Sequence, residues 1–216
     1  TESTFGLPIY RWPDPADVER ELNTWWRDAQ AAGRTAVVYT YALGKAQRLL
    51  AMLDRSTGPI LVHGAVDRLL PPYRDAGVDL PRTARANADN AKPARGKALV
   101  VAPPSAATAA WLRKFGPHTD AFASGWMTVR GRRRRRSLDR GFVLSDHADW
   151  NDLLRTIDET GAEAVGVTHG SVHALVRYLR EEKRLDAFPV ATRYVGEHDE
   201  TDPTGNPDAT DPEDAG

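Results

Sequence analysis

The segment from residue 142 to residue 172 reads FVLSDHADWNDLLRTIDETGAEAVGVTHGSV and combines a strand, a helix and a second strand. Each of its two apolar runs ends on a polar cluster, which places His147 and His169 twenty-two residues apart. The runs do not alternate between apolar and polar residues, which is typical of parallel strands covered by helices. Ligands of such sheets bind beyond the carboxyl ends of the strands. The segment therefore predicts a site at that edge, with a histidine at the end of each strand.

The same alternation of strand and helix runs along most of the chain and predicts an α/β fold, with a mostly parallel sheet, flanking helices and right-handed crossovers. We expect strands at 35–41, 58–64, 97–102, 121–126, 141–145, 164–168 and 188–195. We expect helices at 14–33, 44–54, 65–73, 105–115, 150–161 and 171–183, with a polar excursion at 77–96. An Asp14–Pro15 pair is expected to begin the first helix, and Pro71 and Pro72 are expected to end the third.

The composition excludes several classes of protein. Hydrophobic residues make up 41% and charged residues 27% of the 216 residues, and no apolar run approaches the roughly 18 residues of a membrane span. The first residues, TESTFGLPIY, lack the basic start and apolar stretch of a signal peptide. Because the chain has no cysteine, disulfides, thiolate metal sites and a cysteine nucleophile are excluded. These features predict a cytoplasmic protein whose metal ligands, if any, are His, Asp or Glu.

Charge divides the chain into a mildly basic part and an acidic tail. Residues 197–216 contain eight acidic residues and no lysine or arginine, so we expect a disordered tail. The remaining 22 acidic and 29 basic residues give residues 1–196 a charge of +7, which permits a polyanionic partner. We expect an extended segment at 1–13, an α/β domain at 14–130, a carboxyl-terminal part at 131–196 and the tail at 197–216.

Both histidine clusters have a purely structural interpretation beside the functional one. In SDHAD, Ser145 or Asp146 would cap the following helix and His147 would be a bystander. In THG, Thr168 would cap the next helix while Gly170 allows a close approach of the backbone. If the two strands are neighbours, their carboxyl ends lie roughly 5–10 Å apart. That distance suits a metal ligand beside an acid–base group.

Two further segments could contact phosphate groups. In YALGKAQRLL, Gly44 and Lys45 precede a helix whose first N–H groups favour anions, although a simple strand–glycine–helix junction is the alternative. The segment RGRRRRRSLDRG at 130–141 could bind phosphates bidentately or could be a solvated basic hairpin tip. Trp126, just before it, could stack on a base or be buried. The candidate nucleic-acid-binding residues are Arg130, Arg132, Arg133, Arg134, Arg135, Arg136 and Lys45.

Six short strings, taken in order, resemble one protein family. They are ESTFG, ALGKAQRLL, APPSA, ASGWM, SDHADW and VTHG. Together they resemble the β-CASP branch of the metallo-β-lactamase-fold nucleases, most closely the ligase-associated DNA exonucleases, which are themselves similar to mRNA 3′-end processing factors. The resemblance covers nearly all of residues 1–195. It implies that 14–130 is the β-CASP cap domain and that 131–196 returns to the metallo-β-lactamase fold.

The resemblance implies roles for three residues. Glu2 and His147 would form a hydrogen-bonded pair that protonates the leaving oxygen, and His169 would coordinate one of two zinc ions. Zinc-bound hydroxide would attack the phosphodiester. The carboxylate would raise the pKa of the imidazole and make it a competent acid near neutrality. DNA repair and an ATP-dependent DNA ligase partner are implied as well.

The chain departs from the family in its metal ligands. The main metal motif HxHxDH is absent, which leaves His169 as the expected ligand, whereas zinc takes three or four. The sequence therefore resembles the carboxyl-terminal half of such a nuclease, and we expect it to be catalytically silent alone. We also expect an exposed apolar surface where the amino-terminal half would pack. The candidates for that surface are Trp12, Trp25, Trp26, Trp126 and Trp150.

The sequence features point to two candidate substrates, DNA and RNA. Histidine at the position of His169 is typical of RNA-acting members of the family, whereas the strings SDHADW and ASGWM favour the ligase-associated DNA group. We expect DNA. The alternatives are a portion of an RNA-processing nuclease and a nucleic-acid-binding α/β module without chemistry.

Overall fold

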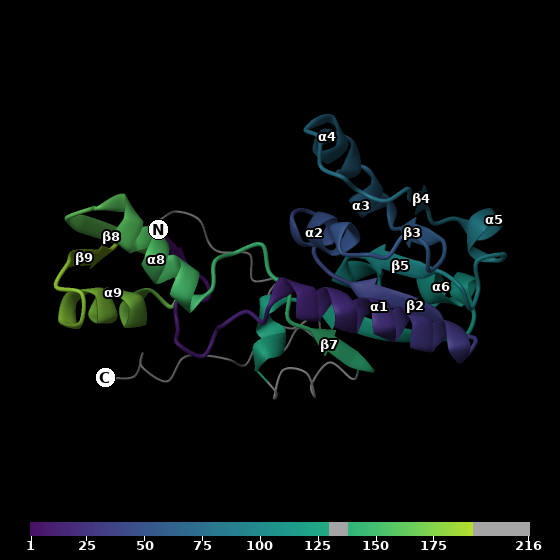
Figure 1. Cartoon of the computed structure of the whole chain (residues 1–216), viewed down its shortest axis with the longest axis horizontal. Helices are drawn as coiled ribbons and strands as arrows, with labels where there is room; N and C mark the ends of the chain where they lie inside the picture. The colour runs from purple at the N-terminus through teal and green to yellow at the C-terminus, as the bar shows by residue number, and fades with distance from the viewer. Residues whose placement is uncertain (130–137, 192–216) are drawn as a thin grey trace.

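The computed structural model describes residues 1–129 and 138–191. Its elements form two groups, a large lobe and a small lobe (Figure 1). The candidate arginines from Arg130 to Arg136 and the acidic tail lie outside the described residues. None of the helices in the described ranges is both long enough and apolar enough to cross a membrane.

The large lobe is built on a six-stranded sheet in which all pairs are parallel, in the order β4-β3-β5-β2-β6-β7. Its strands are β2 (Thr35–Tyr39), β3 (Ile60–Val62), β4 (Ala84–Arg85), β5 (Leu99–Ala102), β6 (His118–Ala123) and β7 (Arg140–Phe142). Every residue of β2 and β5 is buried, because helices cover both faces of the sheet. This arrangement confirms the predicted α/β class.

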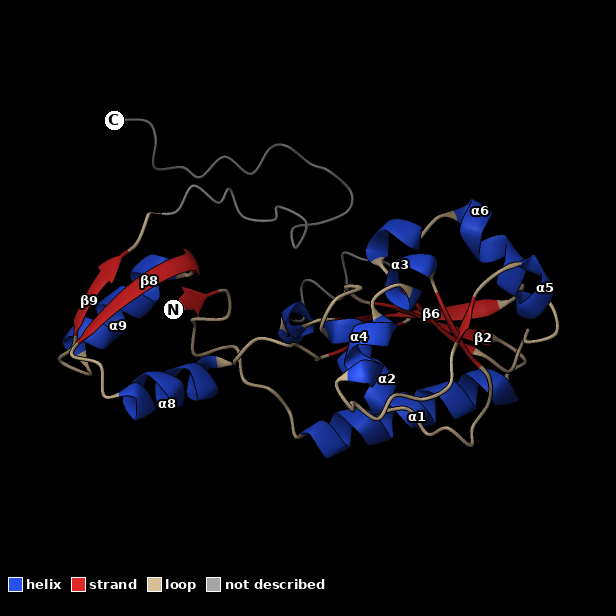
Figure 2. Cartoon of the chain, turned by 90° about the horizontal axis from the view of Figure 1, so that it is seen from above, coloured by secondary structure: helices blue, strands red, loops and turns tan. Residues whose placement is uncertain are grey.

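Short helices and one long helix cover the two faces of this sheet. They are α1 (Pro15–Ala31), α2 (Lys45–Ala51), α3 (Gly64–Asp67), α4 (Leu70–Asp75), α5 (Ala88–Ala91) and α6 (Ala109–Leu112). Figure 2 shows α1 and α2 on one side of the sheet and α5 and α6 on the other. Successive residues of β2 point to opposite sides, so that Val38 joins the apolar cluster with Trp26, and Val37 joins the cluster with Phe115.

The small lobe contains a three-stranded parallel sheet in the order β1-β8-β9. Its elements are β1 (Glu2–Ser3), α8 (Trp150–Thr160), β8 (Ala164–Gly170), α9 (Val172–Glu181) and β9 (Asp186–Pro189). Strand β1 is held by backbone hydrogen bonds from Thr168 N–H to Thr1 O at 2.9 Å and from Ser171 N–H to Ser3 O at 2.9 Å. The first residues of the chain thus complete a sheet made by its last described residues.

Several predicted elements differ in their bounds. Pro71 and Pro72 stand in the first turn of α4 rather than ending a helix, since proline is tolerated where helix N–H groups have no intrahelical partner. The helix expected at 105–115 is divided into the 3₁₀ turns Pro104–Ala106 and Arg113–Phe115 on either side of α6. The strand expected at 121–126 ends at Ala123, where a 3₁₀ helix, Gly125–Thr128, follows.

The remaining differences concern the ends of the sheets. The strand expected at 188–195 is the shorter β9, which begins at Asp186. The polar excursion at 77–96 contains β4 and α5. Strand β7 pairs with β6, so the larger sheet extends past residue 130, the predicted boundary between the two parts of the chain.

Three of the five tryptophans predicted to form an exposed apolar surface are buried, whereas Trp12 and Trp126 are partly exposed. Trp25, Trp26 and Trp150 retain 8%, 0% and 5% of their exposure, because their rings fill the cores of the two lobes. The most exposed large apolar side chains are Leu43 at 62% and Ile9 at 57%. On and just after β9, Phe188 is 43% and Val190 41% exposed.

The backbone of β1 approaches Gly170 at the end of β8 so closely that a side chain there would overlap it. Its φ of +79° is left-handed, and a Cβ there would lie 2.4 Å from Ser3 O and 2.5 Å from Thr4 Cα. Gly161 has a similar φ of +63° but open space around it. We expect Gly161→Ala to cost about 1–2 kcal/mol of unfolding free energy through backbone strain alone. Gly170→Ala should cost at least about 1 kcal/mol more, because the methyl group overlaps backbone atoms.

Chemical denaturation of both glycine variants measures this difference. Hydrogen exchange at Thr168 N–H and Ser171 N–H reports the undocking of β1, and both amides should exchange faster in Gly170→Ala alone. Equal losses of stability in the two variants would contradict the close packing of β1 on β8.

Candidate active site

Two loop segments connect the lobes and carry the candidate site. Residues 143–149 lead from β7 to α8, and residues 4–14 lead from β1 to α1. Figure 2 shows the loops that pass between the two groups of elements. Because β1 belongs to the small lobe while α1 belongs to the large one, both segments are held at each end. The polar residues predicted from SDHAD therefore lie at the junction of the lobes.

Glu2 and His147 are brought into contact across 145 residues of sequence. Glu2 Oε1 lies 3.3 Å from His147 Nδ1, and Thr4 N–H donates to Glu2 Oε2 at 2.7 Å. Burial raises the pKa of Glu2, but the hydrogen bonds from His147 and Thr4 outweigh it and hold that pKa at about 2. Because Glu2 accepts this hydrogen bond from His147, the pKa of His147 is raised above its ordinary value, although burial opposes it. The pair can therefore hold a proton on the imidazole near neutral pH.

The backbone around His147 is fixed from two sides. The Trp12 indole N–H donates to His147 O at 3.0 Å, and His147 N–H donates to Ser145 Oγ at 3.1 Å. Asp149 caps α8 by accepting from Asp152 N–H at 2.9 Å, and its other oxygen accepts from Trp12 N–H at 2.8 Å. The residue that caps this helix is thus Asp149, not Ser145 or Asp146.

Aromatic rings pack around the same junction. The Phe5 ring lies 4.8 Å from the ring of Trp12, 4.9 Å from that of Trp126 and 5.8 Å from that of His147. Tyr10 lies 5.4 Å from Trp126 in an edge-on arrangement. Such contacts are worth about 0.5–1.5 kcal/mol per pair beyond burial. They hold Trp126 within this cluster, and base stacking by Trp126 stays a prediction.

His169 stands near the carboxyl end of β8, on the strand that pairs with β1. Glu2 is opposite Thr168 in this pairing, which places Glu2 beside the segment that contains His169. The φ of His169 is +54°, a conformation uncommon for residues other than glycine, and its carbonyl accepts the hydroxyl of Ser3. Its side chain is exposed. Backbone strain of this kind gathers at functional sites, where surrounding structure holds it in place.

The described residues do not by themselves form a zinc site. Within residues 1–129 and 138–191, no group of three or more His, Cys, Asp or Glu side chains could hold a metal ion. Zinc takes three or four protein ligands, and its catalytic sites keep one position for water. His169 alone does not satisfy this requirement, so any zinc bound by His169 would need ligands from outside these ranges.

The side chain of Lys45 is buried and paired with an aspartate. Its side chain is 4% exposed, and its ammonium lies 3.0 Å from Asp146 Oδ1. It also lies 4.9 Å from the centre of the Tyr41 ring. Contact between Lys45 and nucleic acid stays a prediction, and the other predicted phosphate contacts, Arg130 to Arg136, fall outside the described residues.

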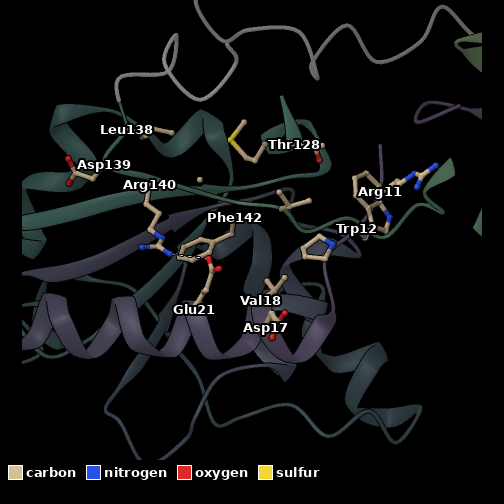
Figure 3. Close-up of a pocket in the computed structure, with 14 residues that line it drawn as sticks. Arg11, Trp12, Asp17, Val18, Glu21, Thr128, Leu138, Asp139, Arg140 and Phe142 are labelled. Atoms are coloured by element: carbon tan, nitrogen blue, oxygen red, sulfur yellow. Dashed lines mark hydrogen bonds and ion pairs between the residues drawn. The ribbon is translucent and has the colours of Figure 1, made fainter. Parts of the chain in front are cut away.

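A separate cavity of about 670 Å³ lies beside β7 (Figure 3). Its wall carries both signs of charge, including Arg11 and Asp17, and Arg140 is paired with Glu21 at 3.0 Å. The mixed charge selects neither an anionic nor a cationic ligand. Neither Glu2 nor His147 lines this cavity.

Comparison with known proteins relates the chain to part of a longer protein. No protein-family profile matches the chain. A protein of Opitutus terrae named as a probable DNA ligase is 32% identical over 189 residues, which is 88% of this chain and 18% of that protein. The chain thus spans less than a fifth of the length of the relative it matches. The similarity relates this chain to one region of that protein.

The pair of Glu2 and His147 predicts a defined dependence of stability on pH. Since the folded pKa of Glu2 is depressed, its contribution is present above its ordinary pKa of 4.5 and is lost as pH falls toward 2. Since the folded pKa of His147 is raised, its contribution is present below 6.5 and is lost as pH rises through the raised value. The pair therefore stabilises most between pH 4.5 and 6.5.

We expect Glu2→Gln to lower the unfolding free energy within that window by up to about 1 kcal/mol, because both side chains are about one third exposed. The loss should shrink on either side of the window in denaturation curves recorded from pH 2 to pH 9. By NMR titration the pKa of His147 should fall in this variant. The matched control is Glu163→Gln, at an exposed glutamate, which should leave both quantities unchanged. An unaltered His147 titration in Glu2→Gln would contradict the pairing.

Proposed function

We propose that this chain is the acid-supplying portion of a metal-dependent nuclease that hydrolyses phosphodiester bonds, with DNA as its substrate. The observation that carries the proposal is the contact between Glu2 and His147. A carboxylate that is hydrogen-bonded to one nitrogen of an imidazole leaves the other nitrogen to exchange a proton with a substrate. The expected function as a repair or processing exonuclease belongs to this proposal.

The pair would act on the leaving group. Nδ1 of His147 faces Glu2, whereas Nε2 lies 4.0 Å from Asp146 Oδ1, which is too long for a hydrogen bond. In the proposed step the oxygen of a water molecule bonds to phosphorus, the bond from phosphorus to the leaving oxygen breaks, and Nε2 of His147 gives its proton to that leaving oxygen. Glu2 stabilises the imidazolium before the transfer and keeps Nδ1–H in place. General acid catalysis of this kind contributes about 10²–10⁴ to rate.

His169 is proposed as one ligand of a metal site that is completed by residues outside the described part of this chain. Its strained backbone, exposed side chain and nearness to β1 support this role. The two zinc ions implied by the family resemblance would need further ligands, since the described residues contain no suitable group. We therefore propose that the chain alone does not hydrolyse nucleic acid.

The similarity to a protein named as a probable DNA ligase favours DNA over RNA as the substrate. An association with a DNA ligase is proposed on the same ground. RNA remains the second substrate because histidine stands at position 169.

One face of the small sheet carries apolar side chains that no other described residue buries, which supports packing by another segment. Buried residues of β8 and β9, such as Val167 and Ala187, pack with α8 and α9. Phe188 and Val190 lie over Gly166, whose Cβ would be 2.7 Å from Val190 Cγ2, and both are more than 40% exposed. We propose that the amino-terminal metallo-β-lactamase-fold half of the nuclease packs on this face.

Activity is tested on the protein encoded by the complete reading frame that contains these residues. We expect metal-dependent cleavage of labelled single-stranded DNA, and a fall in kcat of about 10²–10⁴ in His147→Asn and Glu2→Gln. The control is Glu163→Gln, which should retain wild-type turnover. Cleavage that persists in His147→Asn would overturn the assigned acid.

The isolated chain and an RNA substrate complete this test. The isolated chain should show no cleavage, and metal-dependent cleavage that His169→Ala abolishes would contradict its incompleteness. Faster cleavage of RNA than of DNA of the same sequence by the complete protein would identify RNA as the substrate. Salt-dependent binding without cleavage by the complete protein would favour a nucleic-acid-binding module instead.

The bare sheet face generates a separate prediction. Val190→Ser should weaken the binding of this chain to the metallo-β-lactamase-fold half, produced separately from the neighbouring coding region, because it removes apolar contact area. We expect Kd to rise about tenfold, which corresponds to about 1.4 kcal/mol. Val78→Ser is the matched control, since Val78 is 40% exposed in the large lobe. Equal effects of both changes, or a neighbouring coding region without such a half, would contradict the docking.

A further inference from the structure

We propose that Lys45 is a positioning residue, which holds the turn that carries His147 in place through the carboxylate of Asp146. The catalytic consequence of this proposal rests on the proposed function. The structural part of the proposal does not depend on that function. It concerns the contacts that residues 44–48 make with Ser145 and Asp146.

Lys45 is buried, so its charge must be stabilised by groups inside the protein. An ammonium group removed from water is destabilised unless it is paired. The side chain is 4% exposed, and its ammonium lies 3.0 Å from Asp146 Oδ1 and 4.9 Å from the centre of the Tyr41 ring. A lysine that bound phosphates would need to present its ammonium at the surface. The geometry therefore directs the charge of Lys45 to Asp146.

The residues on either side of Lys45 hold the same turn. Gly44 has a φ of +73°, and a Cβ there would lie 2.0 Å from Asp146 Oδ2, so a side chain at this position would displace the carboxylate. The guanidinium of Arg48 donates to Ser145 O. Three residues within one short segment thus contact the two residues that precede His147.

His147 consequently lies between two carboxylates, those of Glu2 on β1 and of Asp146, which is paired with Lys45. Glu2 lies on the Nδ1 side of its ring, and Asp146 Oδ1 lies 4.0 Å from Nε2. The charged groups that act on the imidazole are Glu2, Lys45 and Asp146. The largest effects on the pKa of His147 are its hydrogen bond to Glu2, which raises it, and burial, which lowers it. Beyond these, Lys45 lowers that pKa and Asp146 raises it. A residue that merely filled space would have neither effect.

Because Lys45 and Asp146 act on the pKa of His147 in opposite directions, variants of the two residues test the proposal. NMR titration of His147 in the purified chain should show a higher pKa in Lys45→Met and a lower pKa in Asp146→Asn than in the wild type. The matched control is Lys183→Met, which removes another lysine–aspartate pair, Lys183 with Asp158 at 2.6 Å, in the small lobe. It should leave the titration of His147 unchanged.

Asp146→Asn keeps the test decisive if the loss of Lys45 prevents folding, because asparagine retains an oxygen that can accept from the lysine. Shifts of His147 that equal the Lys183→Met control, or that share one direction in the two variants, would overturn the proposal. A loss of stability without any shift would show that Lys45 has a structural role only.

The catalytic consequence is tested by measuring kcat and KM of the complete nuclease. We expect Lys45→Met to lower kcat about 10- to 100-fold with little change in KM, since a misplaced acid slows the chemical step. A wild-type protein without nuclease activity would refute the proposed function, whereas the titration would still decide the role of Lys45. Retention of full kcat in a Lys45→Met protein whose His147 titration has shifted would refute the catalytic consequence.

Discussion

The pairing of β1 with β8 is the constraint on which the candidate site depends. Two residues at the start of the chain complete a sheet whose other strands begin more than 160 residues later, and they do so by backbone hydrogen bonds at 2.9 Å. Gly170 makes this approach possible because its missing side chain leaves room for the backbone of Ser3. Without this pairing Glu2 would have no fixed place, and His147 would lose the carboxylate that raises its pKa.

The electrostatic arrangement at the junction follows from partial burial. Glu2 and His147 retain about one third of their exposure, so water can reach the imidazole while the carboxylate still stabilises its proton. The pair of Lys45 and Asp146 is more buried on the lysine side, where it is protected from screening by salt. One pair holds a group that exchanges protons, and the other holds the backbone that carries this group.

Chemistry at this junction would need groups that the described residues do not contain. The strained backbone at His169 and the bare sheet face at Phe188 and Val190 belong to the same small lobe. The relative named as a probable DNA ligase is more than five times as long as the region it shares with this chain. Under the proposed function, the acid would lie here and the metal ligands would come from another segment.

The sequence by itself determined the class of fold and most of the elements. Unbroken apolar strands, helical spacing and the Asp14 cap are local features, which act in the same way wherever the segment lies. The family strings also pointed to Glu2, His147 and His169, although residue spacing alone could not show that Glu2 meets His147. The resemblance implied that contact, and the structure has the two side chains 3.3 Å apart. Only the tertiary structure decided the burial of Trp25, Trp26 and Trp150 and the pairing of Lys45 with Asp146. Each depends on which surfaces meet across the chain, and long-range packing of that kind leaves no periodic signal in a single sequence.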